Sequence, residues 1–242
     1  MNRTAIVTGA SRGIGKAIAL RLAKDGFQVA INYMSSKEEA ISVTGEIEKA
    51  GGRAIAIKAD VAKADEVEKL FAETERQLGK IDVLVNNAGL LKYIKLAEVT
   101  DEIFQRMVDT NLKGVFNTLR LAATRVNEGG RIINLSTSVL ALGLPTYGVY
   151  VATKAAVESM SYVFARELRG RKITVNCVAP GPTATDLFLD GKTKEQIDHF
   201  AKMPPLERLG TPEDIAAVVS FLAGPDGAWV NGQVLRANGG LV

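Results

Sequence analysis

Short apolar runs alternate with longer amphipathic stretches along most of this chain. The runs are rich in β-branched residues and are apolar on both faces, as in 131–135. Such runs are typical of strands in a parallel sheet that helices cover on both sides. We therefore expect strands at 4–8, 28–33, 54–58, 83–85, 131–135, 173–178 and 233–236.

The stretches between these runs carry apolar residues at helical spacing. We expect helices near 13–25, 36–50, 63–78, 101–126, 150–169 and 212–223. Such alternation predicts an α/β fold, a doubly wound (Rossmann) parallel sheet of about seven strands with helices on both faces. Because the chain shows no linker, low-complexity tract or internal repeat, we expect a single domain over 1–242 that carries both a cofactor site and a substrate site.

One segment, 182–211, interrupts the alternation. It contains Pro182, Pro204 and Pro205, and it holds a short amphipathic piece near 193–202. A long insertion after a strand is often a mobile cover over a site. We therefore expect 182–211 to be a substrate lid.

Composition narrows the possible ligands and partners. The net charge is only +3 and no Lys/Arg cluster stands out, which argues against nucleic acid and suits a small anionic ligand. With the single cysteine Cys177, no intrachain disulfide can form, and the lone His199 cannot supply a metal site by itself. No apolar stretch approaches the ~20 residues of a membrane span, and the start lacks a signal-peptide pattern. We expect a cytoplasmic protein with no metal and no membrane partner.

A glycine-rich turn joins the first expected strand to the first expected helix. Gly9 permits a tight turn, Gly13 lets the backbone approach a pyrophosphate, and Gly15 allows close packing of helix on strand. The free N–H groups and positive dipole end of the helix would face the phosphates. The pattern indicates a dinucleotide site.

The spacing of these glycines, with Thr8 ahead of them, resembles the cofactor motif of the short-chain dehydrogenase/reductase superfamily. Further motifs of that family follow in order along nearly the whole chain: Asp60-Val61, Asn86-Asn87-Ala88-Gly89, Asn111, Tyr150 with Lys154, and Pro180-Gly181 followed by Thr185. Together with the end of the second strand, the resemblance implies a cofactor site made of Gly9, Ser11, Arg12, Gly13, Ile14, Gly15, Asn32, Tyr33, Ser35, Ser36, Lys37, Asp60, Val61, Asn87, Ala88, Gly89, Tyr150, Lys154, Pro180, Gly181, Thr183 and Thr185.

The end of the second strand indicates the type of cofactor. Rossmann enzymes specific for NAD place an acidic residue there to bind the ribose 2′-hydroxyl. This chain has Asn32 instead, and no carboxylate follows before Glu38. Hydroxyls, an amide and a cation accept a 2′-phosphate, and Arg12 can reach the same group. The sequence therefore predicts NADP(H).

Tyr150 and Lys154 are the expected catalytic pair, since their spacing places them on one face of a helix. A nearby ammonium stabilises phenolate and lowers the pKa of a tyrosine, which can then exchange a proton with the substrate oxygen. The resemblance implies that Lys154 also binds the nicotinamide ribose and that Asn111 supports a proton relay through water.

The hydroxyl that orients the substrate has two candidates. Thr137 lies 13 positions before Tyr150, the usual separation in the family, and strand register also favours it. Ser138 lies 12 positions before Tyr150 but has the usual residue type. Either side chain offers a donor and acceptors. Both stay candidates, and residue type inclines us to Ser138.

The resemblance implies a carbonyl reductase, similar to bacterial 3-oxoacyl-acyl carrier protein reductases and fungal polyhydroxynaphthalene reductases. Its substrate would be a 3-oxoacyl thioester, an aryl ketone or a quinone-like compound. The alternatives are a dehydrogenase that oxidises a secondary alcohol and a non-catalytic NADP-binding sensor. The chain ends in Ala237-Asn238-Gly239-Gly240, where many relatives carry Val-Asp-Gly-Gly. We expect an apolar substrate site walled by Leu142, Leu144, Tyr147, Leu187, Phe188 and Met203.

The helices at 101–126 and 150–169 carry more apolar positions than one sheet face needs. Superfamily members commonly pair these helices between subunits, so we expect a homotetramer, or at least a dimer. The apolar positions in question are Ile103, Met107, Val115, Phe116, Leu119, Val157, Met160 and Phe164.

Overall fold

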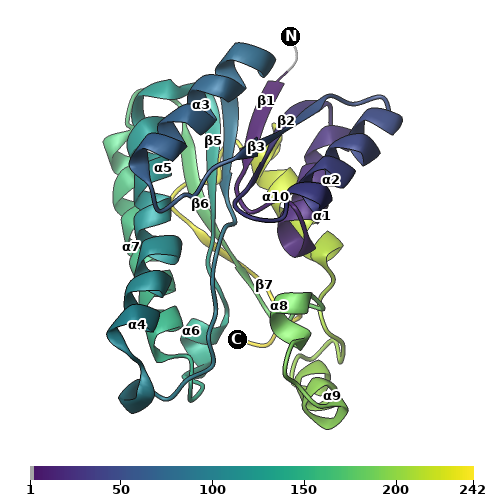
Figure 1. Ribbon diagram of the computed structural model, residues 1–242, viewed down its shortest axis with the longest axis vertical. Helices are drawn as coiled ribbons and strands as arrows, with labels where there is room; N and C mark the ends of the chain where they lie inside the picture. The colour runs from purple at the N-terminus through teal and green to yellow at the C-terminus, as the bar shows by residue number, and fades with distance from the viewer. Residues whose placement is uncertain (1–2) are drawn as a thin grey trace.

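The computed structural model describes residues 3–242, and its centre is a seven-stranded parallel sheet in the order β3-β2-β1-β4-β5-β6-β7 (Figure 1). This confirms the predicted α/β doubly wound sheet. The strands are β1 (Arg3–Val7), β2 (Phe27–Tyr33), β3 (Ala54–Lys58), β4 (Ile81–Asn86), β5 (Val126–Leu135), β6 (Thr174–Pro180) and β7 (Val234–Ala237).

Helices cover both faces of the sheet, and each layer closes a separate hydrophobic cluster (Figure 1). One layer consists of α1 (Gly13–Lys24), α2 (Lys37–Lys49) and α10 (Pro212–Ala223). The other consists of α3 (Ala64–Leu78), α5 (Gly114–Arg125) and α7 (Gly148–Glu167). Cys177 lies in β6 with 1% of its surface exposed, as its apolar neighbours in the sequence predict.

The expected helix at 101–126 is divided. It consists of α4 (Asp101–Val108), a π-helical turn η2 (Asp109–Lys113) and α5. β5 then starts at Val126, five residues earlier than expected, because Gly129 and Gly130 form an irregularity inside the strand rather than a loop before it. Gly129 has φ +76°, and a Cβ on Gly130 would lie 2.4 Å from Val126 Cγ1.

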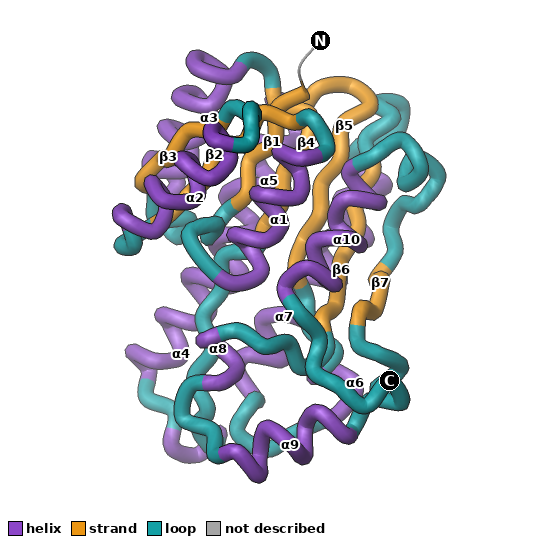
Figure 2. Tube along the Cα trace, turned by 90° about the vertical axis from the view of Figure 1, so that its right-hand side faces the viewer, coloured by secondary structure: helices purple, strands orange, loops and turns teal. Residues whose placement is uncertain are grey.

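The segment 182–211 folds into α8 (Asp186–Leu189) and α9 (Lys194–Lys202) beyond the carboxyl ends of the strands. In Figure 2 these helices and α4 lie at the same end of the molecule. The short α6 (Val139–Leu142) is at that end too, and η1 (Leu96–Glu98) precedes α4.

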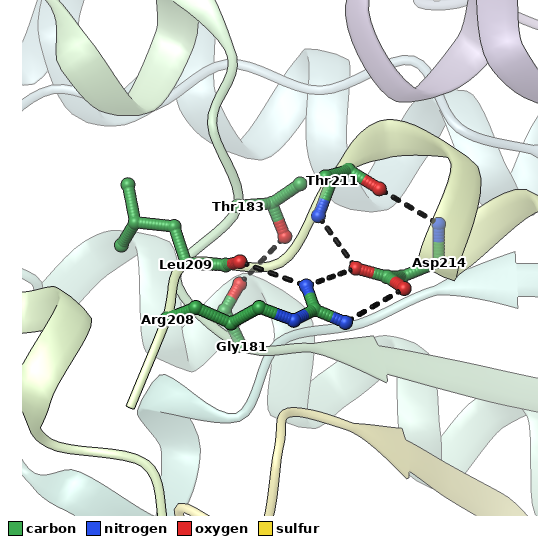
Figure 3. Close-up of polar contacts among 6 residues, drawn as sticks. All are labelled: Gly181, Thr183, Arg208, Leu209, Thr211 and Asp214. Carbon is green, nitrogen blue, oxygen red and sulfur yellow. Dashed lines mark hydrogen bonds and ion pairs between the residues drawn. The ribbon is translucent and has the colours of Figure 1, made fainter. Parts of the chain in front are cut away.

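The two ends of the 182–211 segment lie side by side (Figure 3). Thr183 and Gly210 form a parallel β-bridge. The guanidinium of Arg208 donates to both carboxylate oxygens of Asp214 at 2.6 and 3.0 Å, and Asp214 also forms a capping box with Thr211 at the start of α10. The segment therefore leaves and rejoins the sheet layer at one fixed point.

None of the helices within 3–242 is long and apolar enough to cross a membrane.

Candidate active site

A cavity of about 150 Å³ lies at the carboxyl ends of the central strands. Thr137, Tyr150 and Lys154 line it. Residues of the expected cofactor motifs line it as well, namely Ile14, Asn87, Gly89, Pro180, Gly181, Thr183 and Thr185. The remaining wall is largely apolar and aromatic, with Leu91, Tyr93, Leu142, Leu144, Tyr147, Leu187, Phe188 and Phe200.

Lys154 is a buried cation, with 4% of its surface exposed. Its ammonium donates a hydrogen bond to the Leu135 carbonyl at 2.7 Å and lies 5.8 Å from the centre of the Tyr150 ring. Burial disfavours the charged form and lowers the pKa of Lys154 to about 8. The amine is thus held against the end of β5 on the same side of α7 as Tyr150.

Tyr150 behaves differently from the sequence expectation. Burial raises the pKa of Tyr150 to about 12, and a hydrogen bond from Thr137 lowers it by a smaller amount. We expected the nearby ammonium to lower this pKa. Loss of hydration is the larger effect, because the Lys154 amine is directed at the Leu135 carbonyl. The Tyr150 phenol therefore keeps its proton at neutral pH.

The structure separates the two candidate hydroxyls. Thr137 lines the cavity, and it lies close enough to Tyr150 to lower the pKa of that phenol. Ser138 is 2% exposed, and its hydroxyl donates to the Ala179 carbonyl and accepts from the Asn238 amide, both at 3.0 Å. The position set by β5, rather than residue type, thus decides which hydroxyl reaches the cavity.

Asn111 lies in the π-helical turn and is fully buried. Its Oδ1 accepts from the Leu90 N–H at 2.7 Å, and its Nδ2 donates to the Leu90 carbonyl at 2.8 Å and to Thr153 Oγ1 at 3.2 Å. A Cβ on Gly89 would lie 3.6 Å from Asn111 Oδ1 and 3.7 Å from Lys154 Nζ. Asn111 therefore holds the loop after β4 directly beside the Lys154 amine. Turns of this type are frequent at functional sites.

The glycine loop is packed so closely that Gly9 and Gly15 have no room for a side chain. Asn87 Nδ2 donates to the Thr8 and Gly9 carbonyls at 2.9 and 3.0 Å. A Cβ on Gly15 would lie 2.3 Å from the Gly9 oxygen, and one on Gly9 would lie 2.9 Å from Ala88 Cα. Gly9 also has φ +60°, a backbone conformation that glycine adopts readily.

The start of α1 fits an anionic group. No side chain among residues 3–242 caps this helix, and its first turn contains no acid. A Cβ on Gly13 would lie 3.6 Å from the Thr185 methyl group, so Thr185 of the 182–211 segment faces the loop. Uncapped N–H groups at a helix start bind phosphate well, and the loop thus fits a dinucleotide pyrophosphate.

Asn32 has a structural task beneath this loop. It is 2% exposed; its Oδ1 accepts from the Gly9 N–H at 3.2 Å and its Nδ2 donates to the Ala59 carbonyl at 2.9 Å. The amide is committed to backbone groups instead of facing outward. Tyr33 is also buried. The side chains that remain available for a phosphate are those of Arg12, Ser35, Ser36 and Lys37, of which Ser36 is half-buried and the others exposed.

Two other expected cofactor residues, Asp60 and Val61, have structural contacts, and a third, Ser11, is nearly buried. Asp60 Oδ1 accepts from the Ala62 N–H at 3.0 Å and so closes the turn after β3. The buried Val61 packs against Gly114, where a Cβ would lie 2.6 Å from Val61 Cγ2. Ser11 is 9% exposed.

Sequence reasoning missed part of the substrate wall. Of the expected residues only Met203 is absent from the cavity lining, whereas Leu91, Tyr93 and Phe200 line it without having been expected. Tyr93 could have been predicted from its place in the loop after β4, because loops that follow parallel strands meet at the same edge of the sheet. Phe200 belongs to the amphipathic piece at 193–202.

The chain is similar to known proteins over nearly its whole length. The family described as enoyl-(acyl carrier protein) reductase matches residues 9–242. A short-chain type dehydrogenase/reductase of Picea abies is 49% identical over 99% of this chain and 92% of its own length. The 3-oxoacyl-(acyl-carrier-protein) reductase FabG of Staphylococcus epidermidis is 44% identical over 100% and 99%. The structure of angucycline C-6 ketoreductase LanV with bound NADP matches with a TM-score of 0.93, at 38% identity over 99% of this chain and 95% of that one.

The buried Lys154 gives the protein a specific dependence of stability on pH. Its pKa is about 8 when folded and near 10.5 otherwise, so between these values the unfolded state binds more protons and stability rises with pH. We expect native protein to gain up to about 3 kcal/mol relative to Lys154→Met between pH 7 and pH 10.5. Urea unfolding across this range measures the difference. The exposed Lys194→Met is the control, and a constant difference between Lys154→Met and native protein would contradict the assignment.

Proposed function

The chain belongs to the short-chain dehydrogenase/reductase superfamily, and on that basis we propose that it is an NADP(H)-dependent carbonyl reductase that converts a ketone to a secondary alcohol. The observation that carries the proposal is the shared cavity of Tyr150, Thr137 and Lys154 at the carboxyl ends of the strands. The nicotinamide would supply the hydride, while the protein supplies orientation and the proton.

In this proposal, the Thr137 and Tyr150 hydroxyls hold the substrate oxygen, and Tyr150 donates the proton as the alkoxide forms. Lys154 binds the ribose beside the nicotinamide, and Asn111 keeps the loop after β4 against Lys154. The raised pKa of Tyr150 favours this direction, because a protonated phenol is ready to donate. Oxidation of an alcohol would require the phenolate and would proceed best at high pH. A non-catalytic sensor would have no use for these hydroxyls in one cavity.

For the cofactor, we propose that the pyrophosphate lies at the start of α1, under Thr185, and that adenine lies near Asp60 and Val61. Arg12, Ser35, Ser36 and Lys37 would bind the 2′-phosphate. Neither Arg12 nor Lys37 has an ion-pair partner in 3–242, so both charges are available. LanV, with NADP bound, supports the choice of cofactor.

For the substrate, the relatives indicate two kinds of ketone. The Staphylococcus epidermidis relative is named for a 3-oxoacyl group on a carrier protein, and LanV is named for a ketone of an angucycline. We propose that the 182–211 segment is the substrate lid. Its fastened ends and its contribution of Leu187, Phe188 and Phe200 to the cavity wall support this role.

We also propose a homotetramer, or at least a dimer, although fewer exposed apolar residues support it than the sequence suggested. Most of the apolar residues expected at subunit contacts are buried within the chain, including Met107, Val115 and Phe164. Phe116 of α5 is 46% exposed, however, and Phe104 of α4 is 49% exposed. Large exposed aromatic side chains of this kind are typical of contact surfaces between proteins.

Cofactor preference is tested by titrating NADPH and NADH against protein fluorescence. We expect Arg12→Ala to weaken NADPH binding about tenfold or more, since a charge-assisted contact with phosphate contributes ~1.5–3 kcal/mol. NADH binding should change little. Lys24→Ala removes the same charge from the far end of α1 and serves as the control. Equal affinities of native protein for the two cofactors would contradict the proposal.

The roles of the hydroxyls are tested with three variants in a ketone reduction assay that follows NADPH absorbance. Tyr150→Phe keeps the ring but removes the proton donor, so kcat should fall by about 10²–10⁴. Thr137→Ala should also lose activity, whereas Ser138→Ala should retain most of it, because Ser138 faces away from the cavity.

The panel should include 3-oxoacyl thioesters, aryl ketones, diketones and quinones, and thermal unfolding should show that each variant is folded. Tyr150→Phe activity above about a tenth of the native value would mean that another acid acts. A larger loss in Ser138→Ala than in Thr137→Ala would reverse the assignment of the orienting hydroxyl.

Subunit association is tested by light scattering at micromolar concentration. We expect a mass about four times, or at least twice, that of the 25.8 kDa chain. Replacing Phe104 and Phe116 with Ser should lower the mass, because it removes apolar surface from the proposed contact. A native mass near 25.8 kDa would exclude the oligomer.

A further inference from the structure

Three tyrosines form a continuous aromatic wall that starts at the proposed proton donor. The Tyr150 and Tyr147 ring centres lie 6.4 Å apart, and those of Tyr147 and Tyr93 lie 5.2 Å apart, both in edge-to-face contact. All three rings line the cavity, so the wall leads from its floor toward Tyr93, which is 40% exposed.

The backbone holds this wall in place. The Ile94 N–H donates to the Thr146 carbonyl at 3.1 Å, which joins the loop after β4 to the turn before α7. Thr146 has φ +72°, a rare conformation for a residue with a branched side chain. Tyr147, directly after it, is 7% exposed. These backbone features fix the aromatic wall on one side of the cavity without any contact from the proposed lid.

Lys192, between α8 and α9, bridges the proposed lid and this wall. Its ammonium donates to the Tyr93 hydroxyl at 2.7 Å and lies 4.1 Å from the centre of the Tyr93 ring. It also lies 4.4 Å from the Phe188 ring on its own segment and donates to the Phe188 carbonyl. Across residues 3–242, no acid forms an ion pair with Lys192. Its close contacts are thus made with Tyr93 and Phe188, while the nearby Asp190 charge favours its charged form.

The two aromatic residues that Lys192 contacts, Tyr93 and Phe188, line the cavity. The ends of the 182–211 segment are fastened by the Thr183–Gly210 bridge and by Arg208 with Asp214, so the stretch between them is positioned by contacts such as that of Lys192. In another protein, an apolar cavity of the same 150 Å³ holds one benzene molecule. Tyr93, Tyr147, Phe188 and Phe200 make much of this wall aromatic, which suits a flat ring.

We propose that Lys192 is a specificity-determining residue, which holds Phe188 and Tyr93 in place through its contacts with both rings and so completes an aromatic site that selects compact aryl ketones over extended 3-oxoacyl chains. The inference rests on the proposed carbonyl reductase function. A flat ring can pack edge-to-face against Tyr147 while its carbonyl oxygen meets Tyr150 and Thr137. A long aliphatic chain offers no ring for these edge-to-face contacts.

The test compares Lys192→Met, Lys192→Arg and the control Lys194→Met, an exposed lysine two positions away. For each, kcat/KM with NADPH is measured for acetophenone and for a six-carbon 3-oxoacyl thioester of N-acetylcysteamine. Native protein should prefer acetophenone. Lys192→Met should lower kcat/KM for acetophenone about tenfold, mainly through KM, and should leave the thioester unchanged or improved. Lys192→Arg should restore the preference, since a guanidinium also stacks on aromatic rings.

Binding of acetophenone to protein saturated with NADP⁺, measured by thermal shift, separates this inference from the proposed function. If no carbonyl is reduced but Lys192→Met binds acetophenone about tenfold more weakly than Lys194→Met, the proposed function is wrong and the specificity role stands. If native protein prefers the thioester, or if Lys192→Met and Lys194→Met differ by less than twofold in both assays, the specificity role is overturned, whether or not the protein is a reductase.

Discussion

The junction between the ends of β1 and β4 is the constraint on which the rest of the site depends. Thr8 Oγ1 accepts from the Asn87 and Ala88 N–H groups, and the Asn87 amide returns two hydrogen bonds to the glycine loop. Because this space is full, Gly15 admits no Cβ and α1 must start directly against the loop. The reversal of strand order at β1 and β4 leaves this edge as the natural ligand site of such a sheet.

Burial sets the chemistry of the cavity. Loss of hydration shifts the buried Lys154 and the half-buried Tyr150 toward their neutral forms, so the pKa of Lys154 falls and that of Tyr150 rises. Their helix is tied to the sheet by a buried polar network, in which Asn134 donates to Ser161 of α7 at 2.7 Å and accepts from Asn86 at 2.8 Å. Satisfied buried networks of this kind fix geometry, which a proton donor requires.

Most of the fold could be predicted from the sequence, because strand and helix patterns depend on neighbours close along the chain. All seven strands were expected at the right places, and α10 and β3 with the right bounds. The errors lie where local pattern is ambiguous. The strand expected at 131–135 begins at Val126 and contains an irregularity around Gly129 and Gly130, and the single helix expected at 101–126 is divided by the π-helical turn around Asn111.

The sequence by itself determined which residue types stand at the sheet edge: the glycine loop, Tyr150 with Lys154, and an amide, Asn32, where NAD-specific enzymes have an acid. Only the tertiary structure decided how they are used. It directed Thr137 rather than Ser138 into the cavity, committed the Asn32 amide to Gly9 and Ala59, and brought Lys192 onto Tyr93, 99 positions away. The physical reason is that hydrogen-bond commitment and loss of hydration depend on neighbours from distant parts of the chain, whereas residue identity and spacing do not.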